Sequence, residues 1–156
     1  MQSIVPATGA TPRAGAVLLA AGRSTRMGGP NKLLLEFDGE PMVRRALRTL
    51  QAVPLDPIMV VLGPAADAVR AALDGLPACG SCSAPQAEDH QVSVDAGLRA
   101  LAGPVEAIVI MLADQPLLDA GDLRWLLAQW HALARGGAVV PVFAGRRGNP
   151  VIIDAA

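Results

Sequence analysis

The sequence predicts an α/β fold in which helices cover both faces of an open, mainly parallel sheet, and two observations lead to this expectation. Three continuous apolar runs bounded by turn residues, 15–21, 57–63 and 107–114, are typical of strands buried on both faces. Segments with helical spacing lie between these runs and after them. Because strands that alternate with helices form right-handed βαβ units, we expect a three-layer α/β/α arrangement. Such sheets bind ligands at the carboxyl ends of their strands, so the residues after each run are candidates for a site.

Amphipathic spacing predicts the helices and two further strands. The segments with helical spacing are 41–50, 65–76, 92–103 and 120–137. The first begins at Pro41, which suits the first turn of a helix, and places Val43, Leu47 and Leu50 on one face. Two shorter apolar stretches, 138–143 and 150–154, are expected to form later strands.

Composition limits the classes of protein to which the chain can belong. A chain of 156 residues with 52% hydrophobic and 17% charged residues is expected to form one globular domain with a real core. A net charge of -1 and an aromatic fraction of 3% lack the basic surface and stacking rings of a nucleic-acid binder. No apolar run approaches the roughly 18 residues of a membrane span, and residues 1–14 lack the features of a secretory signal. We therefore expect a flexible leader over 1–14, a single domain over 15–156, a cytoplasmic location, and neither nucleic-acid nor membrane partners.

The two cysteines, Cys79 and Cys82, form the stretch CGSC. This spacing fits a thioredoxin-like redox pair, but such a pair should lead into a helix, and the residues that follow show no apolar periodicity. A zinc site would need two more ligands, and His90 and His131 are the only histidines. The favoured interpretation is that both cysteines are incidental small residues.

A glycine-rich, basic stretch follows the first apolar run. Its glycines bring backbone amides close to a ligand, and its cations favour phosphates; the residues concerned are Gly22, Arg23, Arg26, Gly28, Gly29 and Lys32. A Walker A loop is excluded because Leu33 follows the lysine, and a dinucleotide fingerprint is excluded because residue 24 is serine. A surface loop with solvated arginines remains the alternative.

The stretch LAAGRSTRMGGPNKLL resembles the signature L-A-[AG]-G-x-S-x-R-M-G-x-x-K of the MobA-like nucleotidyltransferases, which include the molybdopterin cytidylyl- and guanylyltransferases. Three later stretches, SVDAGLRAL, VIMLADQPLL and RRGNPVII, resemble family landmarks and follow in the family's order, so the resemblance runs from about Val17 to Ile153. It implies a Rossmann-like nucleotidyltransferase fold. Within the family, the A-A-G form seen at 20–22 goes with cytidine nucleotides, and the Ala21 methyl would narrow the base pocket against a purine. The ADQP strand end also resembles the cytidylyltransferase branch.

The resemblance implies a reaction and a set of site residues. A phosphate oxygen of an acceptor attacks the α-phosphorus of an NTP and pyrophosphate leaves, a reaction that depends mainly on alignment and charge neutralisation. The implied catalytic residues are Arg26, Lys32 and Asp114, with Asp114 holding Mg²⁺. The implied nucleotide-binding residues are Leu19, Ala20, Ala21, Gly22, Arg23, Ser24, Gly28, Lys32 and Ser93. The implied acceptor-side residues are Gln115, Arg147, Gly148, Asn149 and Pro150.

Simpler interpretations stay open for several of these residues. Asp114 would also fit an N-cap or turn aspartate before Pro116, and the stretch 146–150 would fit a charged hairpin. Relatives commonly carry a glycine near the start of the segment with Ser93, where this chain has Asp89 and His90. His90 is a weak candidate for substrate contact, and His131 is expected to be a surface or packing residue.

Trp125 and Trp130 lie among leucines in an amphipathic segment, so core packing is expected for both rather than stacking on a ligand.

The resemblance points to a CTP-dependent enzyme that makes the cytosine dinucleotide form of the molybdenum cofactor. Family members continue for several dozen residues with a late aspartate motif that supplies a second metal ligand, so the domain looks C-terminally shortened. Three explanations stay open: the sequence is truncated, a partner supplies the remainder, or catalysis is weakened. Asp154 is a weak substitute ligand.

Two rival functions accompany this expectation. The same chemistry could serve GTP or another phosphorylated acceptor such as a sugar phosphate. A protein of a different class would bind nucleotide or molybdopterin without catalysis and deliver it to a molybdoenzyme.

Overall fold

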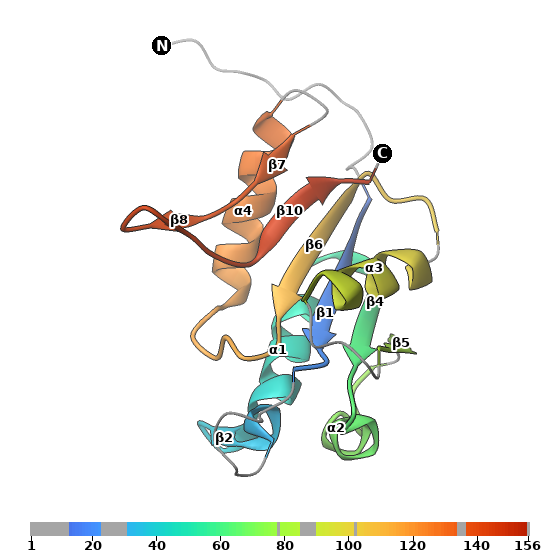
Figure 1. The fold of residues 1–156 in the computed structure, drawn as a ribbon. Coiled ribbons are helices and arrows are strands. Elements are labelled where there is room, and N and C mark those ends of the chain that lie inside the picture. Colours follow the sequence, from blue (N-terminus) through green and yellow to red (C-terminus); the bar gives the residue numbers. More distant parts are fainter. Residues whose placement is uncertain are drawn as a thin grey trace.

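The computed structural model describes residues 13–22, 31–77, 79–84, 90–101, 103–133 and 137–155. Its centre is a sheet with strand order β5-β4-β1-β6-β10-β7 (Figure 1). The strands are β1 (Ala14–Ala20), β4 (Leu55–Leu62), β5 (Gly80–Ser83), β6 (Ala107–Leu112), β7 (Ala138–Val139) and β10 (Val151–Asp154). Strands β5, β4, β1 and β6 run parallel, whereas β10 is antiparallel to both of its neighbours. The predicted mainly parallel sheet is therefore confirmed.

Helices connect the parallel strands, as the spacing predicted. They are α1 (Met42–Gln51), α2 (Ala66–Ala72), α3 (His90–Ala100) and α4 (Ala120–Ala132), and a short 3-10 turn, η2 (Lys32–Leu34), precedes α1. Two small hairpins lie outside the main sheet: β2 (Glu36–Phe37) with β3 (Glu40–Pro41), and β8 (Val142–Phe143) with β9 (Arg146–Arg147). In the part of the chain that the structure describes, no helix is long and apolar enough to cross a membrane.

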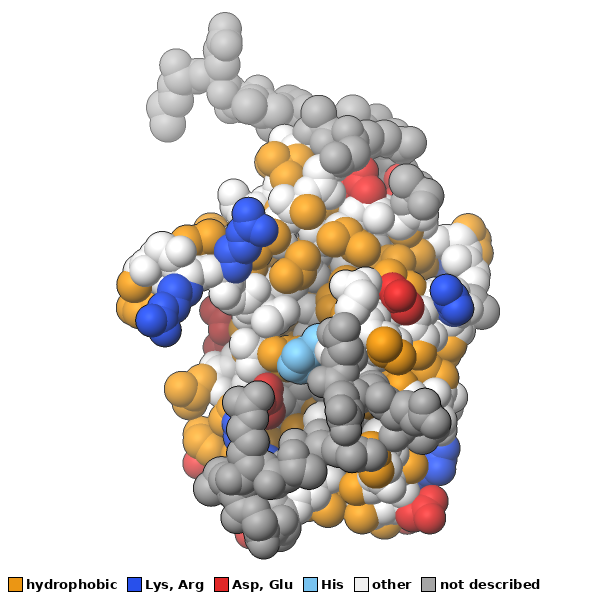
Figure 2. All heavy atoms as spheres, in the orientation of Figure 1, with side chains coloured by type: hydrophobic (Ala, Val, Ile, Leu, Met, Phe, Trp, Pro, Cys, Tyr) orange, Lys and Arg blue, Asp and Glu red, His pale blue; other side chains and the backbone are white. Residues whose placement is uncertain are grey.

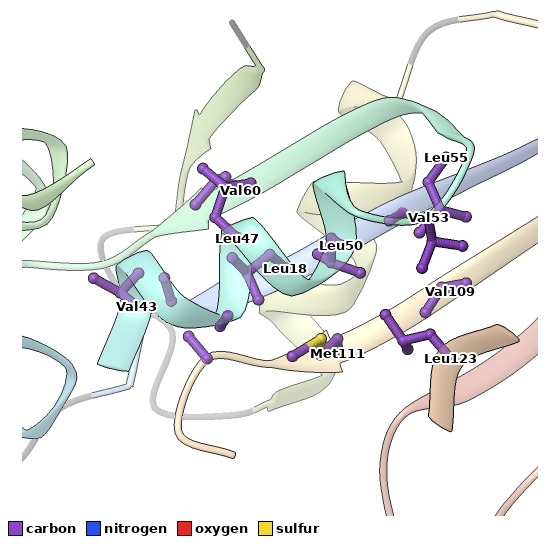
Figure 3. Close-up of a cluster of buried hydrophobic side chains, with 14 of the residues drawn as sticks. Leu18, Val43, Leu47, Leu50, Val53, Leu55, Val60, Val109, Met111 and Leu123 are labelled. Carbon is purple, nitrogen blue, oxygen red and sulfur yellow. The ribbon is translucent and has the colours of Figure 1, made fainter. Parts of the chain in front are cut away.

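Alternate residues of β1 face two separate hydrophobic clusters, as strand geometry requires. Leu18 packs in a cluster that also contains buried side chains of α1, α2 and α4. Val17 and Leu19 pack in a second cluster with residues of α3. Figure 3 shows the first cluster, where Leu47 and Leu50 of α1 lie against the sheet. Helices thus cover both faces of the sheet, and the three-layer prediction is confirmed.

Helix α3 packs so closely on the sheet that only glycine fits at one of its positions. A Cβ added at Gly97 would lie 2.4 Å from Cγ1 of Val17 and 2.8 Å from Cγ2 of Val61. This contact fixes the distance between α3 and strands β1 and β4. Ser93, one turn closer to the N-terminus of α3, is buried at 4% exposure on the same side of the helix. The packing therefore sets Ser93 near the carboxyl ends of the strands.

Two sequence predictions about the later chain need correction. The stretch 138–143 was expected to be one strand, but it divides between β7 and β8 in different sheets, and Pro141 at the division has no N–H to donate to a ladder. Trp125 was expected in the core, but it is 61% exposed. The buried stripe of α4 runs through Leu123, Leu126 and Leu127, and residue 125 falls outside that spacing. Trp130 lies on the stripe and packs against the core, as expected.

Candidate functional site

The backbone converges where β1, β4 and β6 end, at one edge of the sheet. The N–H of Ala113 donates to the carbonyl of Leu19 over 3.1 Å, which continues the pairing of β6 with β1 past the end of both strands. A Cβ added at Gly63 would lie 2.4 Å from the carbonyl oxygen of Ala21, so the turns after β4 and β1 are nearly in contact. Ala21 is buried and Gly22 is exposed. These turns form the floor of the candidate site.

Lys32 and Asp114 meet at this edge although 82 positions separate them in the sequence. Lys32 Nζ lies 3.2 Å from Asp114 Oδ2, close enough for a hydrogen-bonded ion pair. The side chains are 51% and 39% exposed, so both remain accessible to solvent and to a ligand. The 3-10 turn that carries Lys32 is held by Asn31 Oδ1, which accepts from the N–H of Leu33 over 3.1 Å, and by the buried side chain of Leu33. The backbone that carries Lys32 is therefore fixed against the rest of the fold.

The predicted acceptor-side loop reaches the same edge because β10 runs antiparallel to β6. Val151 at the start of β10 pairs with Ile110 near the end of β6, so residues 148–150 lie beside the turn after β6. Gln115 Nε2 donates to the carbonyl of Asn149 over 3.2 Å and joins the two segments. Among the described residues, Gln115 Oε1 is the buried side-chain oxygen with no hydrogen-bond partner.

Arg147 lies on the β8–β9 hairpin, which projects away from the sheet (Figure 1). Its side chain is exposed, and so are Arg146 and the apolar residues Val142 and Phe143. Figure 2 shows basic and hydrophobic side chains gathered on this projection. The hairpin form that the sequence left open for this stretch is observed, and it leads directly into the loop at Gly148.

The structure brings most of the predicted nucleotide-side residues to one place and leaves others undetermined. Leu19 and Ala21 face α3 and Ala20 faces α1, all at the carboxyl end of β1. The predicted residues Arg23, Ser24, Arg26 and Gly28 lie outside the described residues. The signature places two residues between its glycine and lysine, whereas this chain has three between Gly28 and Lys32, so the sequence match is looser there than expected. Lys32 nevertheless reaches Asp114.

Asp114 lies in a turn directly after β6, as one of its simpler interpretations expected, but two other alternative roles for aspartates are wrong. Asp114 is not the N-cap of α4, because Asp119 holds that position and forms a capping box with Asp122. Asp154 is not beside Asp114, because it pairs with Ala107 at the opposite end of β6 and accepts from Trp130 Nε1 over 2.7 Å. Within the described ranges, no group of three histidine, cysteine or acidic side chains forms a ready-made metal site. Among the described residues, Asp114 places one accessible carboxylate at this edge of the sheet.

The cysteines, at the edge strand β5, and His131, near the end of α4, lie away from Lys32 and Asp114. Cys79 and Cys82 are free thiols at and within β5, and burial raises the pKa of each thiol. A raised pKa disfavours the thiolate that redox chemistry needs, which agrees with the expectation that they are incidental. His131 is exposed and packs edge-on against Trp130, with ring centroids 5.2 Å apart. His90 is exposed and is the first residue of α3, one turn before Ser93, so it lies toward the carboxyl edge of the sheet.

Arg45, which no sequence pattern singled out, contacts the turn that carries Asp114. Its Nε donates to the carbonyl of Pro116 over 2.7 Å. The sequence offered no signal for this contact, because Arg44, Arg45 and Arg48 all read as the solvated side of one amphipathic helix.

Comparison with known proteins assigns the family. Residues 16–156 match the MobA-like NTP transferase domain, and the chain belongs to this family. It is 36% identical over 138 residues to the bifunctional protein GlmU of Pelobacter propionicus, covering 86% of this chain and 29% of that protein. The chain thus spans less than a third of the length of that curated relative.

Solved structures agree with this assignment. Rv0371c from Mycobacterium tuberculosis H37Rv superposes with a TM-score of 0.79 at 30% identity, covering 92% of this chain and 72% of the other. A second structure of Rv0371c is a complex with manganese. A nucleotidyl transferase from Methanothermobacter thermautotroptrophicus gives a TM-score of 0.75 at 27% identity, covering 92% of this chain and 72% of that one.

Proposed function

We propose that this protein is a metal-dependent nucleotidyltransferase that transfers CMP from CTP to the phosphate of molybdopterin and releases pyrophosphate. The observation that carries the proposal is the pairing of Lys32 with Asp114 at the carboxyl edge of the sheet. On one side of this pair lies the Ala21–Gly22 turn, and on the other lies the loop 148–150. This arrangement supports a nucleotide on one side of the pair and a phosphorylated acceptor on the other.

The site fits a divalent cation that is carried by the nucleotide. Mg²⁺ in such sites typically binds one or two carboxylates and otherwise water and substrate phosphates. Asp114 supplies one accessible carboxylate, in keeping with the lack of a fuller ligand cluster among the described residues. When bound, Mg²⁺ would neutralise phosphate charge and polarise the reacting phosphorus. The manganese complex of Rv0371c supports a divalent cation in this family.

The residues of this chain would contribute charge and alignment rather than proton transfer. Lys32 would leave Asp114 to bind the triphosphate and stabilise the departing pyrophosphate, and Arg26 would assist it. A phosphate acceptor is already ionised at neutral pH, so the reaction needs no general base. The proposed reaction therefore assigns no proton transfer to His90, the first residue of α3, or to His131 on α4. Ser93 would contact the base or ribose from α3.

The acceptor side supports a second candidate within the same chemistry. On that side, Gln115 Nε2 donates to the backbone carbonyl of Asn149. This bond holds the loop in place but offers no contact that would select a pterin over another acceptor. Transfer to another phosphorylated acceptor, such as a sugar phosphate, is therefore the runner-up. A non-catalytic protein that delivers molybdopterin to a molybdoenzyme is the alternative of a different class. Pyrophosphate release separates both enzymes from the binder.

The identity of residue 21 predicts the choice of base. Wild-type protein is expected to bind Mg²⁺·CTP about 10-fold more tightly than Mg²⁺·GTP, because a single methyl group in a closed pocket discriminates by roughly this factor or more. Titration calorimetry measures both affinities. Ala21→Gly should bring the ratio toward one. Ala16→Gly, at a buried alanine of the same strand whose side chain lies on the other face of the sheet, serves as the matched control. Tighter binding of GTP by the wild type would overturn the assignment of CTP.

A further inference from the structure

The turn between β6 and α4 carries Asp114 and has few backbone ties of its own. Before it, the sheet holds the N–H of Ala113. After it, the capping box at Asp119 holds the start of α4. Between these points Pro116 has no N–H to donate and Leu117 is 82% exposed. One backbone hydrogen bond lies within the turn, from the N–H of Leu118 to the carbonyl of Gln115 over 3.3 Å, and it does not tie the turn to the rest of the fold. The position of Asp114 therefore depends on contacts that other elements make with this turn.

Arg45 makes the shortest of these contacts, from the middle of α1. Its Nε donates to the carbonyl of Pro116 over 2.7 Å, two residues after Asp114. A hydrogen bond from a charged guanidinium is shorter and stronger than one between neutral groups. The side chain is only 32% exposed, which limits competition from water. The contact therefore fixes the backbone of the turn more firmly than a surface hydrogen bond would.

The rest of the Arg45 side chain is held by the β2–β3 hairpin. Its NH1 lies 3.8 Å from Asp38 Oδ2 and 3.9 Å from Glu40 Oε1, and its guanidinium carbon lies 5.3 Å from the centroid of the Phe37 ring. These contacts hold the guanidinium in one orientation, so Nε is directed at Pro116 without a further loss of side-chain freedom. Lysine could not replace this arrangement, because its ammonium has no planar fork that serves two partners at once.

We propose that Arg45 is a positioning residue that fixes the turn after β6 and thereby sets where the Asp114 carboxylate lies. The proposal rests on the proposed function, in which Asp114 binds the metal–nucleotide complex. Gln115 holds the same turn from the side of β10 through the carbonyl of Asn149. The turn is thus held between α1 and the acceptor-side loop, with Asp114 at its start. The guanidinium acts through the backbone of the turn, by way of the carbonyl of Pro116.

Helix α1 supplies two matched controls, because its other arginines have different partners. Arg48 NH1 pairs with Glu40 Oε2 over 3.1 Å, and so contacts the same hairpin as Arg45. Arg44 NH1 donates to the carbonyls of Ala72 and Asp74, over 3.1 and 2.7 Å, and so makes the same kind of bond to a different segment. A general loss of charge or of helix packing would appear in all three glutamine variants.

The test compares Arg45→Gln with Arg48→Gln and Arg44→Gln in the 156-residue chain. Hydrogen–deuterium exchange of the peptide 113–119 reports the turn directly, and titration with Mn²⁺·CTP reports the carboxylate. Arg45→Gln is expected to speed exchange in this peptide and to weaken Mn²⁺·CTP binding about 10- to 100-fold, the usual effect of removing a group that orients a metal ligand. The two control variants are expected to stay within about 2-fold of the wild type.

Any other result overturns either the role of Arg45 or the proposed function. Wild-type protein that binds no Mn²⁺·CTP overturns the proposed function, and with it the role of Arg45. Tight binding by the wild type and by Arg45→Gln alike overturns the role of Arg45 and leaves the proposed function standing. Equal losses in Arg45→Gln and Arg48→Gln also overturn the role, because they assign the effect to the hairpin contacts that the two arginines share.

Discussion

Replacing Asp114 with asparagine is expected to slow pyrophosphate release by at least about 100-fold, because the site loses the carboxylate that would hold the metal and charge stabilisation in the transition state is worth factors of this size. The fold should persist. The ion pair with Lys32 is about half exposed, and pairs of this kind contribute about 0 to 1 kcal/mol to stability. Steady-state pyrophosphate assays measure the rate, and thermal melting measures the stability.

Asp67→Asn is the control for the Asp114 prediction. Asp67 is a fully exposed aspartate of α2 that pairs with Arg70, and its replacement should change neither the rate nor the melting temperature. An Asp114→Asn variant that keeps more than half of the wild-type rate would remove Asp114 from the mechanism. A variant that unfolds would show instead that the ion pair matters for the fold.

Leu47→Ala is expected to lower the free energy of unfolding by about 2 to 5 kcal/mol. Leu47 is fully buried where α1 packs on the sheet, so truncation leaves a cavity among neighbours that cannot collapse into it (Figure 3). Urea denaturation monitored by circular dichroism measures the change. Leu133→Ala, at a leucine that is 48% exposed, should cost less than about 1 kcal/mol. Equal losses for the two variants would contradict the assignment of this cluster as the core.

The parallel centre of the sheet could be predicted because its strands carry a local signal. Strands β1, β4 and β6 are continuous apolar runs, since both of their faces are covered, and turn residues mark their ends. Strand β5 has no such signal. It is the polar stretch GSCS at the edge of the sheet, where most of its residues are exposed, and only its pairing with β4 makes it a strand. The antiparallel direction of β10 likewise follows from pairing with β6 rather than from its own residues.

The site divides in the same way between local and long-range features. The glycine-rich signature predicted Lys32 and the later stretch VIMLADQPLL predicted Asp114. The carboxyl-edge rule for α/β sheets predicted that both would lie on one edge. Their contact at 3.2 Å follows from the fold. The hydrogen bonds from Gln115 to Asn149 and from Arg45 to Pro116 are accepted by backbone carbonyls. Every residue has a backbone carbonyl, so the residue types in a sequence do not indicate which one accepts a bond. Sequence alone could not distinguish Arg45 from Arg44 and Arg48 for this reason.

The most direct test of the account is pyrophosphate release by the purified chain supplied with Mg²⁺, CTP and molybdopterin. We expect pyrophosphate to appear only when the acceptor is present, in a one-to-one ratio with the dinucleotide product. Release with a sugar phosphate in place of molybdopterin would keep the chemistry and change the acceptor. A folded protein that binds molybdopterin but releases no pyrophosphate with any NTP would contradict the account and identify a binding protein instead.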